Sequence, residues 1–123
     1  MNTQLTVIIP VFNEINSIEQ LLIKVLNNKI DKQIIVVDDH SSDGTRDLLI
    51  NKFKNKVDKI IFHQKNLGKG AAIKSAQKYI LGKYTIIQDA DLEYDPADYL
   101  TLVNEAEKNK FQAVYGSSVL NKN

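Results

Sequence analysis

The sequence predicts an α/β fold with three layers, α/β/α, in which helices cover both faces of a mostly parallel β-sheet. Short apolar runs rich in β-branched residues alternate along the chain with segments whose apolar residues recur at helical spacing. The strand-like runs are almost continuously apolar, as is typical of parallel strands buried on both faces. Connections between the expected elements are short, which favours one sheet with helices packed on each side.

The first half of the chain predicts two strands, each followed by a helix. The apolar runs at 5–10 and 34–37 predict the strands. Apolar residues at helical spacing predict the first helix: Ile18, Leu21, Leu22, Val25 and Leu26. Ser42 or Asp43 can cap the second helix through a side-chain oxygen. The inner face of that helix would carry Leu48, Leu49 and Phe53.

The second half predicts three more strands and two helices. The expected strands are 60–62, 84–88 and 111–115. A helix starts near Gly68 and continues to Ile80, with Gly82 at the position of a helix-terminating glycine. Asp95 followed by Pro96 predicts the start of the last helix, because proline is favoured at the first helical position. Its inward-facing residues would be Tyr99, Leu100, Leu102, Val103 and Ala106.

The composition excludes several classes of protein. The chain has 123 residues, which is a usual size for one domain, and we expect a single domain over 1–123. Its 16 basic and 15 acidic side chains give a formal net charge of +1, without the basic excess of a dedicated nucleic-acid-binding protein. The absence of cysteine excludes disulfides, zinc–thiolate sites and cysteine nucleophiles.

The N-terminus lacks the basic region and apolar core of a signal peptide. No window reaches the roughly 18 apolar residues that span a bilayer. We therefore expect a cytoplasmic protein, which a partner or a further segment could bring to the cytoplasmic face of a membrane as a peripheral protein.

Polar side chains cluster where each predicted strand ends. In sheets of this kind ligands bind beyond the carboxyl ends of the strands, at a switch in strand order. The clusters after the five strands are Asn13 and Glu14; Asp38, Asp39 and His40; Asn66 to Gly70; Asp89, Asp91 and Glu93; and Gly116 to Ser118. Loops at the opposite edge are only rich in lysine and asparagine. The carboxyl edge of the sheet is therefore the expected functional site.

An acidic pattern follows the fourth predicted strand directly. Asp89, Asp91 and Glu93 are two residues apart, so in an extended segment their side chains point the same way. Converging carboxylates repel one another unless a cation binds between them, and Mg²⁺ prefers such oxygen ligands. The pattern indicates a metal site, with a solvated acidic loop as the alternative.

Two further clusters have both a functional and an ordinary interpretation. An acidic residue after the second strand, here Asp38 or Asp39, can bind a ribose hydroxyl or a base N–H, or can cap a turn. The helix start around Lys69 offers backbone N–H groups and a cation to a phosphate, or is a glycine turn with a surface lysine. His63 has no companion in the sequence and is interpreted as structural.

Five segments in order give the chain a specific resemblance to a known family. They are VIIPVFNE (7–14), VVDDHSSDGT (36–45), NLGKGAAI (66–73), QDADLEYDP (88–96) and AVYGSS (113–118). Together they resemble the family 2 glycosyltransferases, and most of all the dolichyl- and polyprenyl-phosphate sugar transferases, the dolichol-phosphate mannosyltransferase-like branch. The resemblance covers nearly the whole chain. It implies a GT-A fold, a nucleotide-sugar donor and an Asp-x-Asp (DXD) motif that binds Mg²⁺ or Mn²⁺.

The resemblance also implies roles for individual residues. Those expected at the nucleotide sugar are Pro10, Phe12, Glu14, Asp38, Asp39, Lys69, Asp89 and Ala90. Those expected at the metal are Asp89, Asp91 and Glu93, with Asp91 as the principal ligand and catalytic residue. Within the first set, Asp39 would accept a hydrogen bond from the base, and Lys69 would face the donor phosphates.

The implied reaction is metal-dependent transfer of a sugar from GDP-mannose or a UDP-sugar, with inversion at the anomeric carbon. The metal and Lys69 would stabilise charge on the leaving nucleoside diphosphate. A polyprenyl or dolichyl phosphate acceptor needs no base, because a phosphate monoester is already anionic near neutral pH. Asp39 could pair with the N3–H of uracil or the N1–H of guanine, so both nucleotides stay open.

Members of this branch are longer than this chain, and we expect it to hold the donor half, with the acceptor part absent from it. The family commonly has Gly-Ser-Arg where this chain has Gly116-Ser117-Ser118, so a hydroxyl replaces a guanidinium that could clamp a phosphate. We therefore expect metal-dependent nucleotide binding with weak or no turnover.

One alternative to a glycosyltransferase is a non-catalytic module that binds nucleoside diphosphate or serves assembly. A remote one is a response-regulator receiver domain, which would carry its acidic pair after the first strand.

Overall fold

The computed structural model describes residues 4–91, 99–109, 111–115 and 118–121. The strands are β1 (Leu5–Val11), β2 (Lys32–Asp38), β3 (Lys59–Phe62), β4 (Tyr84–Ile87), β5 (Phe111–Tyr115) and β6 (Ser118–Asn121). The helices are α1 (Ile18–Asn27), α2 (Thr45–Leu48), α3 (Lys69–Gln77) and α4 (Tyr99–Asn109), and α2 continues as a π-helical turn, η1 (Leu49–Phe53). None of the helices in the described part has the length and apolar character that a membrane span needs.

The six strands form one sheet in the order β3-β2-β1-β4-β5-β6. Neighbours from β3 to β5 are parallel, and β6 pairs with β5 in the antiparallel direction. The predicted α/β fold with a mostly parallel sheet is confirmed. The receiver alternative is wrong, because a receiver has the strand order 2-1-3-4-5. Here the strand order reverses at β1, so the carboxyl ends of β1 and β4 flank the switch point at which such sheets bind ligands.

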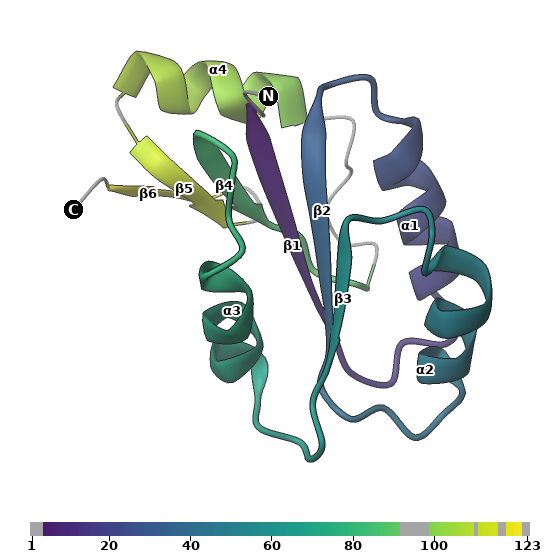
Figure 1. The fold of residues 1–123 in the computed structure, drawn as a ribbon. Helices are drawn as coiled ribbons and strands as arrows, with labels where there is room; N and C mark the ends of the chain where they lie inside the picture. Colours follow the sequence, from purple (N-terminus) through teal and green to yellow (C-terminus); the bar gives the residue numbers. More distant parts are fainter. Residues whose placement is uncertain (1–3, 92–98, 110, 116–117, 122–123) are drawn as a thin grey trace.

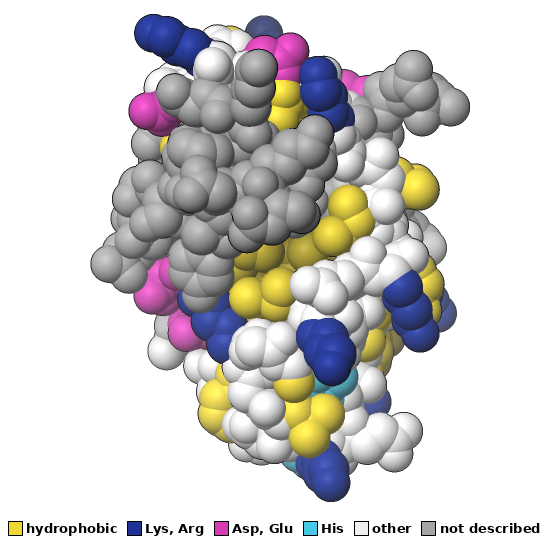
Figure 2. All heavy atoms as spheres, turned by 90° about the vertical axis from the view of Figure 1, so that its left-hand side faces the viewer, with side chains coloured by type: hydrophobic (Ala, Val, Ile, Leu, Met, Phe, Trp, Pro, Cys, Tyr) yellow, Lys and Arg dark blue, Asp and Glu magenta, His cyan; other side chains and the backbone are white. Residues whose placement is uncertain are grey.

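Alternating side chains of the buried strands serve two separate cores. One core joins β1, β2 and β4 to α1, η1 and α4, and includes the fully buried Leu5, Ile18, Leu49 and Tyr99. The other joins the opposite face to α3 through Ile8, Ile35, Ala72 and Ala76. Figure 1 shows α3 on one side of the sheet and α1 with α2 on the other. On the face that carries α3, hydrophobic side chains form a band near the middle of the described surface, with basic side chains around it (Figure 2).

Helix α3 ends at Gln77, earlier than the sequence indicates. The following loop is held instead by buried polar side chains of β1 and β2. Thr6 Oγ1 accepts from Gly82 N at 2.8 Å and donates to Gln33 Oε1 at 2.7 Å. Gln33 Nε2 donates to the carbonyl of Tyr79 at 2.7 Å. Gly82 therefore does not cap the helix; it lies against the start of β1.

The close approach at Gly82 predicts a large cost for any side chain there. A Cβ at this position would lie 2.5 Å from Thr6 N and 2.6 Å from the carbonyl carbon of Leu5. Backbone must move to relieve these contacts, so Gly82→Ala should lower the free energy of unfolding by about 2 kcal/mol or more. Gly70→Ala is the matched control, since a Cβ there meets nothing within 4 Å. Urea unfolding of both variants measures the difference, and equal midpoints would contradict the packing described here.

Candidate functional site

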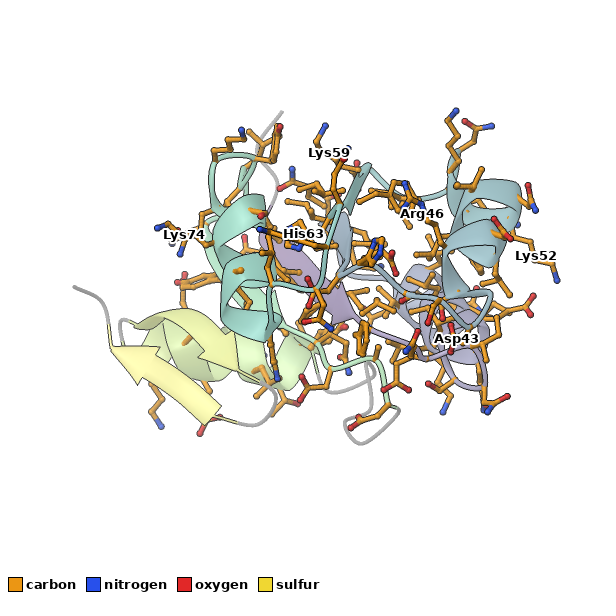
Figure 3. The ribbon with its side chains drawn as sticks, turned by 90° about the horizontal axis from the view of Figure 1, so that it is seen from below. Asp43, Arg46, Lys52, Lys59, His63 and Lys74 are labelled. Atoms are coloured by element: carbon orange, nitrogen blue, oxygen red, sulfur yellow. The ribbon has the colours of Figure 1, made fainter. Side chains whose placement is uncertain are left out.

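A pocket of about 270 Å³ lies at the carboxyl ends of β1 and β4. Its lining residues are Pro10, Val11, Phe12, Glu14, Asp39, Lys69, Ala72, Asp89, Ala90 and Asp91. They come from the end of β1 and its loop, the end of β2, the first turn of α3 and the segment after β4. Phe12 is 44% exposed although it is a large aromatic residue, so its ring is available to a ligand. Figure 3, which looks at the molecule from below, shows these loops toward the viewer.

The loops after β1 and β4 are joined through Ser17. Its hydroxyl lies 2.9 Å from Glu14 Oε2 and 2.7 Å from the carbonyl oxygen of Ala90. The backbone N–H of Glu14 donates to Thr45 Oγ1 at 3.1 Å. These contacts fix Glu14 at the pocket wall and hold the Asp-x-Asp segment against the loop after β1.

The loop after β1 is also tied to the loop after β2. Asn13 has a left-handed backbone with φ of 52°, which asparagine tolerates better than most residues. Its side-chain oxygen accepts from Ser42 N at 2.8 Å, and its N–H donates to Ser41 Oγ at 2.9 Å. Asp43 accepts from the N–H groups of Ile15 and Thr45 and from the Thr45 hydroxyl. Burial would raise the pKa of Asp43, but these hydrogen bonds outweigh it and hold the pKa below its ordinary value.

Asp39 is a buried carboxylate in the pocket wall, with 4% of its surface exposed. Its Oδ1 accepts from His63 Nδ1 and from Leu67 N, each at 2.8 Å, and its Oδ2 accepts from Gly68 N at 2.8 Å. Burial would raise the pKa of Asp39, but the hydrogen bond from His63 and those from the two backbone N–H groups together lower it. The carboxylate thereby anchors the loop that leads into α3.

The first residue of α3 extends across the pocket. Lys69 Nζ forms an ion pair with Asp89 Oδ1. Gly68, just before it, has φ of 97°, a left-handed conformation that favours glycine. The loop thus turns sharply at Gly68 and places a cation beside the Asp-x-Asp segment. The lysine and the carboxylate are 42% and 21% exposed, so the pair is open to a ligand.

Eight of the predicted site residues line this one pocket: Pro10, Phe12, Glu14, Asp39, Lys69, Asp89, Ala90 and Asp91. Asp38 does not line it. Its side chain is fully buried, Oδ2 accepts from Ser41 N at 3.1 Å, and Oδ1 has no hydrogen-bond partner. Strand alternation directs it to the face opposite Asp39.

Glu93, the third predicted metal ligand, lies outside the described residues. His40 is exposed in a left-handed turn and lines no part of this pocket.

Three residues at the site were not among those that the sequence indicated. Val11 and Ala72 line the pocket, and His63 lies directly behind Asp39. Ala72 is three residues after Lys69 in α3, so helical spacing could have indicated it. His63 is not an isolated structural histidine, because its Nε2 also bonds Ser75 Oγ of α3 at 2.8 Å. In Figure 3 it lies beside α3, whereas Lys74 of the same helix points away from the strands.

Comparison with known proteins gives relatives that carry this segment as part of a longer chain. The dolichyl-phosphate beta-glucosyltransferase of Dictyostelium discoideum is 33% identical over 131 residues, which cover 94% of this chain and 40% of that protein. This chain spans less than half the length of that relative.

Solved structures share the fold. Mannosyltransferase PcManGT from Pyrobaculum calidifontis, in complex with GDP-Man and Mn²⁺, matches with a TM-score of 0.72 and 26% identity over 87% of this chain and 32% of that one. TarS from S. aureus, in complex with UDP-GlcNAc, matches with a TM-score of 0.72 and 23% identity over 89% of this chain and 32% of that one. These neighbours confirm the predicted GT-A fold. The model of the family Glycosyl transferase family 2 matches residues 6–123, and the chain therefore belongs to glycosyltransferase family 2.

Proposed function

We propose that this chain forms the donor site of a metal-dependent, inverting glycosyltransferase, which moves a sugar from a nucleotide sugar to a polyprenyl or dolichyl phosphate. The observation that carries the proposal is the single pocket in which Asp89, Asp91 and Lys69 meet Phe12 and Asp39. Carboxylates can hold a cation, an ammonium group can bind phosphate and an exposed aromatic ring can stack on a base or sugar, so together these groups suit a nucleoside diphosphate. The names of two relatives, dolichyl-phosphate beta-glucosyltransferase and dodecaprenyl-phosphate galacturonate synthase, support the choice of acceptor.

The donor set at Asp89 and Asp91 fits Mg²⁺ or Mn²⁺. Among the described residues, no group of three or more acidic, histidine or cysteine side chains is placed so that it could hold a metal ion. A full set of protein ligands is not needed, however, because Mg²⁺ is commonly held by one or two carboxylates together with substrate phosphates. Asp91 would be the principal ligand and Asp89 a second one, with Glu93 as a further ligand. When bound, the metal would supply Lewis-acid stabilisation of the diphosphate.

The residues of the chain have separate tasks in this proposal. Lys69 would leave Asp89 for the donor phosphates and stabilise the negative charge that develops as the sugar departs. Pro10, Phe12 and Glu14 would lie against the nucleotide sugar, and Asp39 would accept from the base. The acceptor phosphate attacks the anomeric carbon from the opposite face, and being anionic it needs no base from the protein.

Calorimetric titration of the chain with UDP and with GDP, each with and without Mn²⁺, tests the donor site. We expect binding that requires the metal for at least one nucleotide. Absence of binding under every condition would contradict the donor-site proposal. A second assay measures transfer of labelled sugar from the nucleotide sugar to a polyprenyl phosphate. Metal-dependent transfer by this chain would exclude the alternative of a non-catalytic nucleotide-binding module, whereas binding with weak or no transfer is the result expected of a donor half.

A further inference from the structure

The number of hydrogen bonds that Asp39 can still accept is limited by the protein itself. An ionised carboxylate has about four acceptor positions, two on each oxygen. On Oδ1 both are occupied, by His63 Nδ1 and by Leu67 N. On Oδ2 one is occupied, by Gly68 N. One position, on Oδ2, is left for a ligand in the pocket.

The three protein donors are fixed in place. Leu67 and Gly68 belong to the turn that starts α3, and Gly68 is held there by its left-handed backbone. His63 is 8% exposed and is bonded on both ring nitrogens, to Asp39 and to Ser75. Because a carboxylate only accepts, Nδ1 must carry the proton. A ligand cannot displace this donor without leaving a buried imidazole nitrogen unpaired.

Sheet register explains why His63 reaches Asp39. Asp38 of β2 pairs with Phe62 of β3, and the N–H of His63 donates to the carbonyl of Asp38 at 2.9 Å. The two residues that follow this pair, Asp39 and His63, therefore lie side by side. The contact directly follows the last pair of the parallel ladder, so the register of β2 and β3 positions it.

The two bases that the pocket could receive present different donors. Guanine offers two adjacent donors, N1–H and the N2 amino group, which pair with both oxygens of one carboxylate. Uracil offers a single donor, N3–H, between two carbonyl groups. A carboxylate with one free position, on one oxygen, matches uracil and leaves one guanine donor unpaired.

On this basis, and resting on the donor-site proposal above, we infer that the pocket selects a uridine nucleotide, and that His63 sets this choice by saturating Oδ1 of Asp39. His63 is a positioning residue, since it acts on the base through Asp39. The two nucleotide-sugar complexes among the structural neighbours contain different bases, so the fold alone does not decide between them.

The test is the ratio of the dissociation constants of GDP and UDP, measured by calorimetry with Mn²⁺ on the same protein sample. One unpaired donor in a pocket costs about tenfold in affinity, so UDP should bind at least about tenfold more tightly than GDP. UDP methylated at N3 lacks the donor and should lose a similar factor. Unfolded protein in the sample lowers the apparent stoichiometry of both titrations equally. It therefore does not affect the ratio of the two dissociation constants.

Two substitutions of His63 separate positioning from packing. His63→Leu fills a similar volume and removes the donor, which frees one position on Oδ1. The ratio of the GDP and UDP dissociation constants should then fall toward 1. His63→Asn can place an amide N–H near the position of Nδ1 and should restore the preference for UDP. Equal binding of UDP and GDP by the unaltered chain, or an unchanged ratio in His63→Leu, would contradict the inference alone. If neither nucleotide binds the unaltered chain, the proposed function is contradicted and this inference with it.

Discussion

Asp91→Asn is expected to weaken the Mn²⁺-dependent binding of nucleoside diphosphate by about 100-fold. Substitutions that only disturb the orientation of a metal ligand commonly cost 10–100-fold in metal affinity, so removal of a ligand charge should reach the upper end of that range. The change conserves shape, and Asp91 is exposed, so little effect on folding is expected. Titration of the variant with Mn²⁺ and the preferred nucleotide measures the loss.

Asp31→Asn is the matched control for this experiment. Asp31 is also exposed and carries the same charge, but it precedes β2 at the opposite edge of the sheet. The Asp31→Asn variant should bind the nucleotide with the same Mn²⁺-dependent affinity as the unaltered chain. If Asp91→Asn binds as tightly as this control, Asp91 is not a metal ligand and the proposed chemistry of the Asp-x-Asp segment is wrong.

Asp39→Ala is expected to lower the free energy of unfolding by about 3 kcal/mol, because it leaves one imidazole and two backbone N–H groups without their acceptor. The same change should abolish measurable nucleotide binding, since the loop before Lys69 loses its anchor. Urea unfolding and calorimetry measure the two effects. A variant as stable as the unaltered chain would show that Asp39 does not hold this loop.

The pH dependence of the free energy of unfolding gives a second test of the hydrogen bonds that Asp39 accepts. Asp39 has a pKa below its ordinary value of 3.8 in the folded chain. A carboxyl group of this kind contributes stability that is fully present above its unfolded pKa and is lost as the pH falls through the folded pKa. Between about pH 5 and pH 2 the free energy of unfolding should therefore decrease less steeply in Asp39→Ala than in the unaltered chain. Parallel pH profiles would contradict the lowered pKa.

Most of the fold was predictable because the strands are buried on both faces. The continuous apolar runs at 5–10 and 34–37 correspond to β1 (Leu5–Val11) and β2 (Lys32–Asp38). Strand β6 (Ser118–Asn121) was not predicted, since its four residues form no apolar run that stands out from a loop. Gly82 was misinterpreted because a helix-terminating glycine and a glycine in close backbone contact look the same in a sequence.

The candidate site was predictable where its residues follow strand ends, as Asp39 and Asp89 do. The part that could not be predicted depends on contacts between neighbouring strands. Asp39 and His63 are 24 residues apart and meet only because β2 and β3 pair in one particular register. For the same reason the sequence left uracil and guanine equally open, since the number of free acceptor positions on Asp39 follows from contacts with Leu67, Gly68 and His63.

The most direct test of the central claim, that this pocket binds a metal–nucleoside diphosphate complex, is paramagnetic broadening of backbone amide signals by Mn²⁺ in the presence of UDP. Signals of Lys69, Asp89 and Ala90 should broaden strongly at substoichiometric metal. Signals of Lys32 and Gly82, at the opposite edge of the sheet, should stay sharp. Broadening that spares the pocket, or that is independent of the nucleotide, would contradict the account.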